Sequence, residues 1–88
     1  MNKFIAEFFG TAFFLFVILS TGKAVPIGAA LAVAILLLGV YSGGHFNPAV
    51  SVMMTAAGKL PSANLLPYVI AQVAGGLVAL EIFKRVKM

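Results

Sequence analysis

The chain has 88 residues, of which 62% are hydrophobic and only 9% are charged. A composition this apolar excludes an ordinary soluble domain and indicates a membrane protein. The net charge of +4 comes from Lys and Arg residues at the edges of apolar runs, so we attribute it to membrane topology and not to nucleic-acid binding.

We predict that residues 1–88 form one unit, whose first apolar run covers residues 4–22. A basic start before an apolar run is also typical of a signal peptide, but no small-residue cleavage site follows and the run is long enough to cross a bilayer. We therefore predict a membrane span. It carries one carboxylate, Glu7, within its apolar part, and an ionisable residue at that depth is a candidate functional residue.

The second predicted span covers residues 26–41 and is uncharged. Lys23 and Pro26 interrupt the apolar sequence, so we predict a loop near residues 21–25. The span that remains has roughly sixteen residues, about 24 Å at 1.5 Å per residue. A span this short must stand nearly upright in the bilayer or draw support from its neighbours.

Residues 42–58 are the polar, glycine-rich part of the chain. Gly43 and Gly44 permit a sharp turn, because glycine adopts backbone angles that other residues resist. Asn47 suits the N-cap of a helix, and Pro48 suits its first position. The sequence therefore predicts a loop that leads into a helix.

That helix continues without a breaker to Gly58, a typical C-terminal glycine. It has roughly ten residues, about 15 Å, which is half of a bilayer core of about 30 Å. We therefore predict a re-entrant half-helix. Its positive N-terminal end, tipped by an asparagine, would lie at mid-membrane and could hold polar solutes there.

The third predicted span covers residues 63–84. Ser62 is a candidate N-cap, and Pro67 is tolerated in the first turn or as a mild kink. Glu81 precedes two basic residues by three and four positions, so we expect a surface ion pair. The basic residues that close the span are Lys84, Arg85 and Lys87.

Three spans and one re-entrant segment place the two termini on opposite sides of the membrane. Lys3 and Lys59 then share one side, and the other side carries Lys23, Lys84, Arg85 and Lys87. This modest bias favours a cytoplasmic C-terminus, and it also leaves room for chains inserted in both orientations.

Three segments resemble a known family. Residues 42–50, Ser-Gly-Gly-His-Phe-Asn-Pro-Ala-Val, resemble the first Asn-Pro-Ala segment of aquaporins. Residues 6–11, Ala-Glu-Phe-Phe-Gly-Thr, resemble the start of that family's first span, and residues 68–76 resemble its third. The resemblance covers nearly all of this chain but only the first half of an aquaporin, whose two halves are inverted relative to each other. It implies a passive channel for water and small neutral solutes such as glycerol, in a multi-pass protein of the cell or inner membrane.

A loop at mid-membrane has unpaired backbone groups and must face protein or water. We therefore expect an all-α membrane protein with three spans and one half-helix, in which two identical chains form an antiparallel homodimer. This would rebuild an aquaporin-like right-handed bundle. Small residues that favour close packing occur on each span: Ala6 and Gly10, Gly28 and Ala32, and Ala71, Gly75 and Ala79. The family's tetramers imply four dimers, or eight chains.

Asn47 is the main candidate site residue, because its amide N–H groups can orient water in a channel and interrupt a proton wire. The alternative is an ordinary N-cap without solute contact. The resemblance implies that Pro48 and Ala49 shape the contact between two loops. His45 could act as a pH-sensitive gate, but we favour a bracing role. The loop that we expect to line the pore contains Gly43, Gly44, His45 and Phe46.

Glu7 is expected to accept hydrogen bonds from backbone N–H groups of this loop, and Gln72 could support the same network. The resemblance places the selectivity constriction at Ile27, at Ile35 of the partner copy and at Val50, which stands where the family has an arginine. The two mouths are therefore expected to be apolar and uncharged, so that solutes larger than water could enter.

Two other functions stay open. The chain could be a path for a neutral gas or ammonia, or a non-conducting subunit that completes a pore only with a separate aquaporin half. Enzymatic activity has no support, because one histidine, two carboxylates and no cysteine leave no catalytic or metal-binding set. No cofactor is expected.

Overall fold

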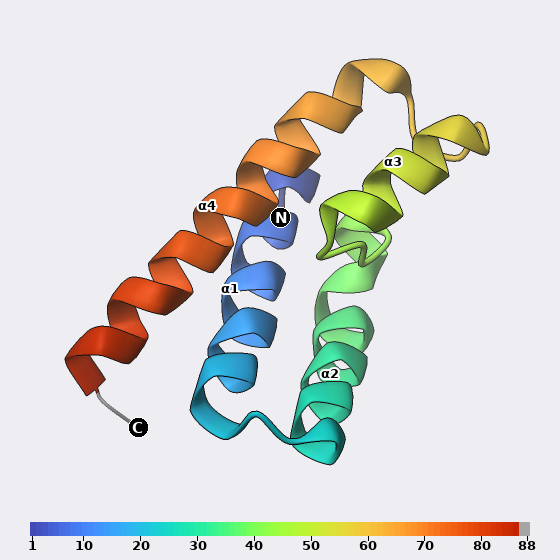
Figure 1. The fold of residues 1–88 in the computed structure, drawn as a ribbon. Coiled ribbons are helices and arrows are strands. Elements are labelled where there is room, and N and C mark those ends of the chain that lie inside the picture. Colours follow the sequence, from blue (N-terminus) through green and yellow to red (C-terminus); the bar gives the residue numbers. More distant parts are fainter. Residues whose placement is uncertain (87–88) are drawn as a thin grey trace.

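The computed structural model describes residues 1–86, which form four helices joined by short connections (Figure 1). The helices are α1 (Lys3–Thr21), α2 (Ala24–Ser42), α3 (Pro48–Ala56) and α4 (Ser62–Val86). Within the described residues, α1, α2 and α4 are long and apolar enough to cross a membrane, so the prediction of an all-helical chain with three such helices is confirmed. Lys87, expected at the membrane edge, lies outside the described residues.

The connection between α1 and α2 is shorter than predicted. Gly22, with φ +62°, ends α1, and α2 begins two residues later at Ala24. The predicted break at Pro26 is wrong, because this proline lies in the first turn of α2, where its missing N–H costs no hydrogen bond. The helix therefore has 19 residues, about 28 Å, and can cross a bilayer core with little tilt.

In the described chain, α1 lies between α2 and α4 and packs against both. The contact with α4 is close at Gly75, where an added Cβ atom would lie 2.5 Å from the backbone oxygen of Phe8. Only glycine permits this approach, as in other close helix crossings. In Figure 1 the two helices lie together near the N-terminus and separate towards the connection between α1 and α2.

The small residues of α1 and α4 therefore do not have the expected role of packing against a second chain. Ala6, Gly10, Gly75 and Ala79 are buried within this one chain, so they do not form the surface of a partner contact. Their spacing predicted a packing face correctly, but the neighbour on that face is a helix of the same chain. Gly28, on α2, is exposed.

Helix α3 has nine residues and packs against α4. It ends at Ala57, and Gly58 follows with φ +76°, which confirms the predicted glycine stop. Helix α4 includes Ser62 as its first residue and contains Pro67. Near the other end of α4, Glu81 lies 3.9 Å from the Lys84 nitrogen and 3.8 Å from an Arg85 nitrogen on an exposed surface, which confirms the surface ion pair.

Candidate functional site

The carboxylate of Glu7 is completely buried and accepts four hydrogen bonds. Its Oε2 atom accepts from the Ser42 hydroxyl at 2.7 Å and from the His45 backbone N–H at 3.0 Å. Its Oε1 atom accepts from the Phe46 backbone N–H and the Gln72 amide, both at 2.8 Å. A buried charge needs this degree of hydrogen bonding to be tolerated. The carboxylate therefore ties α1 to the end of α2, to the loop of residues 43–47 and to α4.

A second set of contacts joins α3 to the same network. The Ser51 hydroxyl lies 2.8 Å from His45 Nδ1 and accepts from Gln72 Nε2 at 2.9 Å. The Tyr68 hydroxyl donates to the Ser42 carbonyl at 2.8 Å, and its ring centroid lies 5.1 Å from that of His45. His45 is buried in these contacts, so its position fits a side chain that braces the loop.

Sequence reasoning missed Ser51, Tyr68 and the hydroxyl of Ser42. Tyr68 and Gln72 are four positions apart, so they share one face of a helix, and Ser51 lies in the first turn of α3. A search for polar residues on shared helix faces could have found the pair on α4. It could not have shown that this face contacts the loop, because the spacing of residues along one helix does not reveal which part of the chain packs against it.

The loop backbone takes left-handed angles at three residues: Gly43 (φ +86°), Gly44 (φ +69°) and Phe46 (φ +54°). This region is unfavourable for a bulky residue such as Phe46, so contacts elsewhere must hold it. Its ring is buried against Gly10, where an added Cβ atom would overlap the ring. The Phe46 ring and the Glu7 carboxylate thus fix the loop from two sides.

Asn47 is the N-cap of α3, as predicted, because its Oδ1 atom accepts from the Ala49 N–H at 2.8 Å. Pro48 occupies the first helical position. Asn47, Pro48 and Ala49, which we call the tip, are exposed, in contrast to the buried His45 and Phe46 before them. The Asn47 amide N–H groups have no protein acceptor within residues 1–86, so they are available to a ligand.

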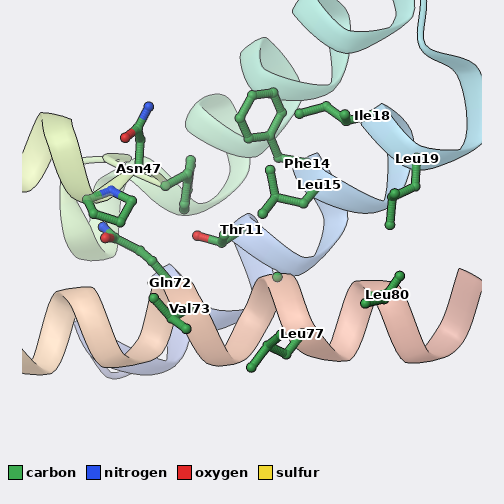
Figure 2. A pocket seen from close by; sticks show the side chains of 13 residues that line it. Thr11, Phe14, Leu15, Ile18, Leu19, Asn47, Gln72, Val73, Leu77 and Leu80 are labelled. Carbon is green, nitrogen blue, oxygen red and sulfur yellow. The ribbon is translucent and has the colours of Figure 1, made fainter.

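A cavity of about 660 Å³ lies beside this tip, between α1 and α4 (Figure 2). Asn47 and Gln72 lie at one end, and Leu19 and Leu80 lie at the other. Thr11 and Gln72 line it, and their side-chain oxygens, Oγ1 and Oε1, are buried and have no hydrogen-bond partner within the described residues. The rest of the lining is mainly apolar, so this space is unlike a site for an ion.

The three residues expected at a constriction lie on two helices. Ile27 and Ile35 are eight positions apart on α2, about 12 Å along its axis, and Val50 is in the first turn of α3. Ile35 packs against the loop, 3.1 Å from the position of an added Cβ at Gly44. One chain does not bring Ile27 and Ile35 to one level, so the constriction stays a prediction that requires a second copy.

Comparison with protein families matches residues 1–88 to the family described as Major intrinsic protein. Aquaporin Z of Brucella melitensis is 40% identical over 97 residues, which cover 93% of this chain and 42% of that protein. Glycerol uptake facilitator protein-like 6 of Lactiplantibacillus plantarum is 39% identical, over 90% of this chain and 41% of its own length. Aquaporin-8 of Notomys alexis is 42% identical, over 91% of this chain and 35% of its own length. The chain thus spans about two fifths of the length of the curated relatives it matches, and no solved structure matches it.

Proposed function

The chain belongs to the major intrinsic protein family, and from this premise we propose that it forms a passive membrane channel for water and small neutral solutes such as glycerol. The names of the relatives support both solute classes, because they include two aquaporins and a glycerol uptake facilitator-like protein. The pore is formed by two antiparallel copies of the chain.

The observation that carries this proposal is that, within residues 1–86, the Asn47 side chain has its oxygen bound and its amide N–H groups free. Its oxygen is held by the Ala49 N–H at 2.8 Å, so its amide N–H groups are the part left to meet a solute. Water accepts these hydrogen bonds through its oxygen, and the positive end of α3 favours the same orientation. A water molecule oriented in this way cannot continue a proton wire, which is how such pores exclude protons.

The surroundings of the tip support a mid-membrane location. The cavity beside Asn47 is lined by Thr11 and Gln72, which lie near the middle of α1 and α4. Both helices are long enough to cross a membrane, so their middle residues are expected near its centre. Helix α3 has nine residues, about 13 Å, and therefore acts as a re-entrant half-helix.

The exposed tip also supports the requirement for a second copy. Asn47, Pro48 and Ala49 are exposed in the single chain, and polar groups at mid-membrane are too costly to leave in contact with lipid. A two-fold axis in the membrane plane brings two such tips together from opposite sides. Assembly of four dimers into an eight-chain complex is the corresponding expectation for the whole channel.

Two other functions have a specific observation in their favour. The exposed residues Asn47, Pro48 and Ala49 also fit a subunit that completes a pore with a different aquaporin half. The apolar side chains of Ile27, Ile35 and Val50 fit a path for a neutral gas or ammonia. Both differ from the main proposal in a measurable way.

The test is osmotic shrinkage of liposomes that contain the purified chain, followed by light scattering after rapid mixing with mannitol or glycerol. Asn47→Asp keeps the N-cap oxygen but removes the amide donors, so we expect water permeability to fall to that of empty vesicles. Asn64→Asp, in the first turn of α4, is the matched control and should conduct normally. Glycerol entry appears as re-swelling after shrinkage.

Each outcome separates the proposals. Well-incorporated wild-type chain that fails to accelerate shrinkage would refute conduction by this chain alone and favour the partner-dependent subunit. Normal water permeability of Asn47→Asp would refute the role of the amide. Ammonia entry without water flow, measured with an internal pH dye, would favour the gas path.

A further inference from the structure

The cavity beside Asn47 is a groove between α1 and α4, and Phe14 contributes an aromatic ring from α1 to its wall. In Figure 2 this ring lies between the Asn47 side chain and Ile18, on the side of the groove away from α4. Phe14 is half-buried in the single chain, so part of the ring is accessible to a small molecule. A solute that moves past Asn47 along α1 would therefore meet this ring.

The face of α1 that carries Phe14 is also the face that holds the loop. Glu7, Gly10, Thr11 and Phe14 follow the spacing i, i+3, i+4, i+7, so they share one side of the helix. Glu7 accepts from the Phe46 N–H at 2.8 Å, and Gly10 lies against the Phe46 ring. Phe14 is seven positions beyond Glu7, about 10 Å along the axis. It is thus the first large side chain on this face beyond the part that the loop covers.

The other large α1 side chains in the groove are less suited to narrow the passage beside Asn47. An added Cβ atom at Gly76 would lie 2.9 Å from Leu15 Cδ1, so Leu15 packs against α4. Ile18 is four positions beyond Phe14, about 6 Å farther along the helix. Phe14 is therefore the side chain of α1 that is placed to narrow this passage.

We propose that Phe14 sets the upper size limit for the neutral solutes that pass Asn47. The inference rests on the pore-forming role proposed above and identifies the residue that distinguishes between its solutes. The amide donors of Asn47 do not make this distinction, because the oxygen of water and the oxygens of a polyol both accept hydrogen bonds. Selectivity in such a pore then depends on its width, and Phe14 determines the width beside Asn47.

The aromatic ring suits this role because it is bulky and apolar. A water molecule needs only the Asn47 donors and little space. A polyol must in addition fit its carbon chain between the amide and the ring, so its passage slows as the chain lengthens. The side chains expected at the mouths, Ile27, Ile35 and Val50, are smaller than phenylalanine and would not impose the same limit.

Substitution of Phe14 by smaller and larger side chains tests this limit in liposomes. Water permeability is measured by shrinkage in mannitol, and polyol permeability by re-swelling in glycerol, erythritol or xylitol, which have increasingly long carbon chains. For the shortest polyol that the wild-type chain retards, we expect the polyol-to-water ratio to rise in Phe14→Leu and Phe14→Ala. The rise for Phe14→Ala should be about tenfold, since even one methylene group in an apolar site changes discrimination by this factor. The ratio for Phe14→Trp should stay at or below the wild-type value.

The matched control is Phe13→Ala, which removes the same atoms from the neighbouring position. Phe13 is 46% exposed and lines a separate cavity between α1 and α2, so this variant should keep the wild-type ratio. A ratio of two permeabilities does not depend on how much of each variant folds and inserts. Phe14→Leu also keeps a large apolar side chain with good helix propensity, so it tests the limit even where Phe14→Ala fails to fold.

The outcomes separate this inference from the proposed function. Water flow through the wild-type chain with an unchanged ratio in the Phe14 variants would overturn the size limit and leave the channel standing. An equal rise in Phe13→Ala would also overturn it. Wild-type chain that is well incorporated but does not conduct water would refute both the channel and the size limit.

Discussion

The two ends of the site differ in how far a single chain completes them. Around Glu7, four hydrogen bonds to the carboxylate and two to Ser51 join α1, α3, α4 and the loop. Beyond Asn47, the groove between α1 and α4 is open, and apolar residues that line it, such as Val73 and Leu77, are exposed. The first region holds its own shape, whereas the second has apolar side chains that the proposed second copy would cover.

One region therefore positions the loop and Asn47, and the other is expected to hold two copies together. The loop and the Asn47 cap are set by contacts within one copy, so each chain can fold with its tip already formed. The groove contributes little to that fold, because its large side chains are partly exposed, as at Leu77 with 59% exposure. Substitutions in the first region should therefore change stability, and substitutions in the second should change association.

The largest effect is expected from Glu7→Ala. This change leaves the Ser42 hydroxyl and the backbone N–H groups of His45 and Phe46 without an acceptor, while Gln72 keeps only Ser51. Each buried donor left unsatisfied costs about 1–3 kcal/mol. We expect a large fall in thermal unfolding temperature in detergent, with loss of water permeability. Glu81→Ala is the matched control, since its carboxylate is exposed and such pairs contribute at most about 1 kcal/mol. Equal losses for both variants would contradict the anchoring role of Glu7.

A smaller effect is expected from Gly75→Ala. The added Cβ atom would lie 2.5 Å from the Phe8 backbone oxygen, and backbone cannot move aside as a side chain can. Overpacking of this kind costs about 1–3 kcal/mol, which thermal unfolding would measure. The control is Gly28→Ala, where nothing lies within 4 Å of the added atom. If Gly75→Ala were as stable as this control, the close crossing of α1 and α4 would be wrong.

Tyr68→Phe should lower the free energy of unfolding by less than Gly75→Ala, because it removes one hydrogen bond and keeps the ring. The hydroxyl donates to the Ser42 carbonyl at 2.8 Å, and loss of a neutral hydrogen bond typically costs about 1 kcal/mol. Tyr41→Phe, on a residue that is 45% exposed, should leave the unfolding temperature unchanged. A shift as large for Tyr41→Phe as for Tyr68→Phe would show that the Ser42 contact adds nothing.

The features that sequence predicted well are local ones. The Asn47 cap, Pro48 at the first helical position and the stop at Gly58 follow from the chemistry of a few consecutive residues. The three membrane-spanning helices were predicted from the length of the apolar runs. The start of α2 was misplaced because a proline in a first turn is compatible with a helix, so Pro26 gave no reliable boundary.

The features that sequence did not predict depend on which helix faces which. The spacing of small residues correctly identified Gly10 and Gly75 as parts of helix-packing faces. We expected these faces to contact a second chain, but both residues pack within the single chain. The hydrogen bonds from the loop N–H groups to Glu7 were predicted and are confirmed. Ser51 was missed, since its contacts arise only when α3 is folded back against α4. The roles of Asn47 and of the constriction residues in a pore stay predictions.

The smallest change in stability, and the sharpest test of the difference between the two regions, is expected from Leu77→Ala. The side chain lines the groove and is 59% exposed in one copy, so its truncation should change the unfolding free energy of chains kept apart in dilute detergent by no more than about 0.5 kcal/mol. In liposomes the same change removes apolar surface that the proposed second copy would cover, so the dimer fraction measured by chemical cross-linking and the water permeability should both fall. Leu36→Ala removes the same atoms from an exposed position on α2 and should alter neither. A large loss of stability in the separated chain would mean that the groove already belongs to the core of one copy, and the distinction between a self-contained region and one that requires a neighbour would be wrong.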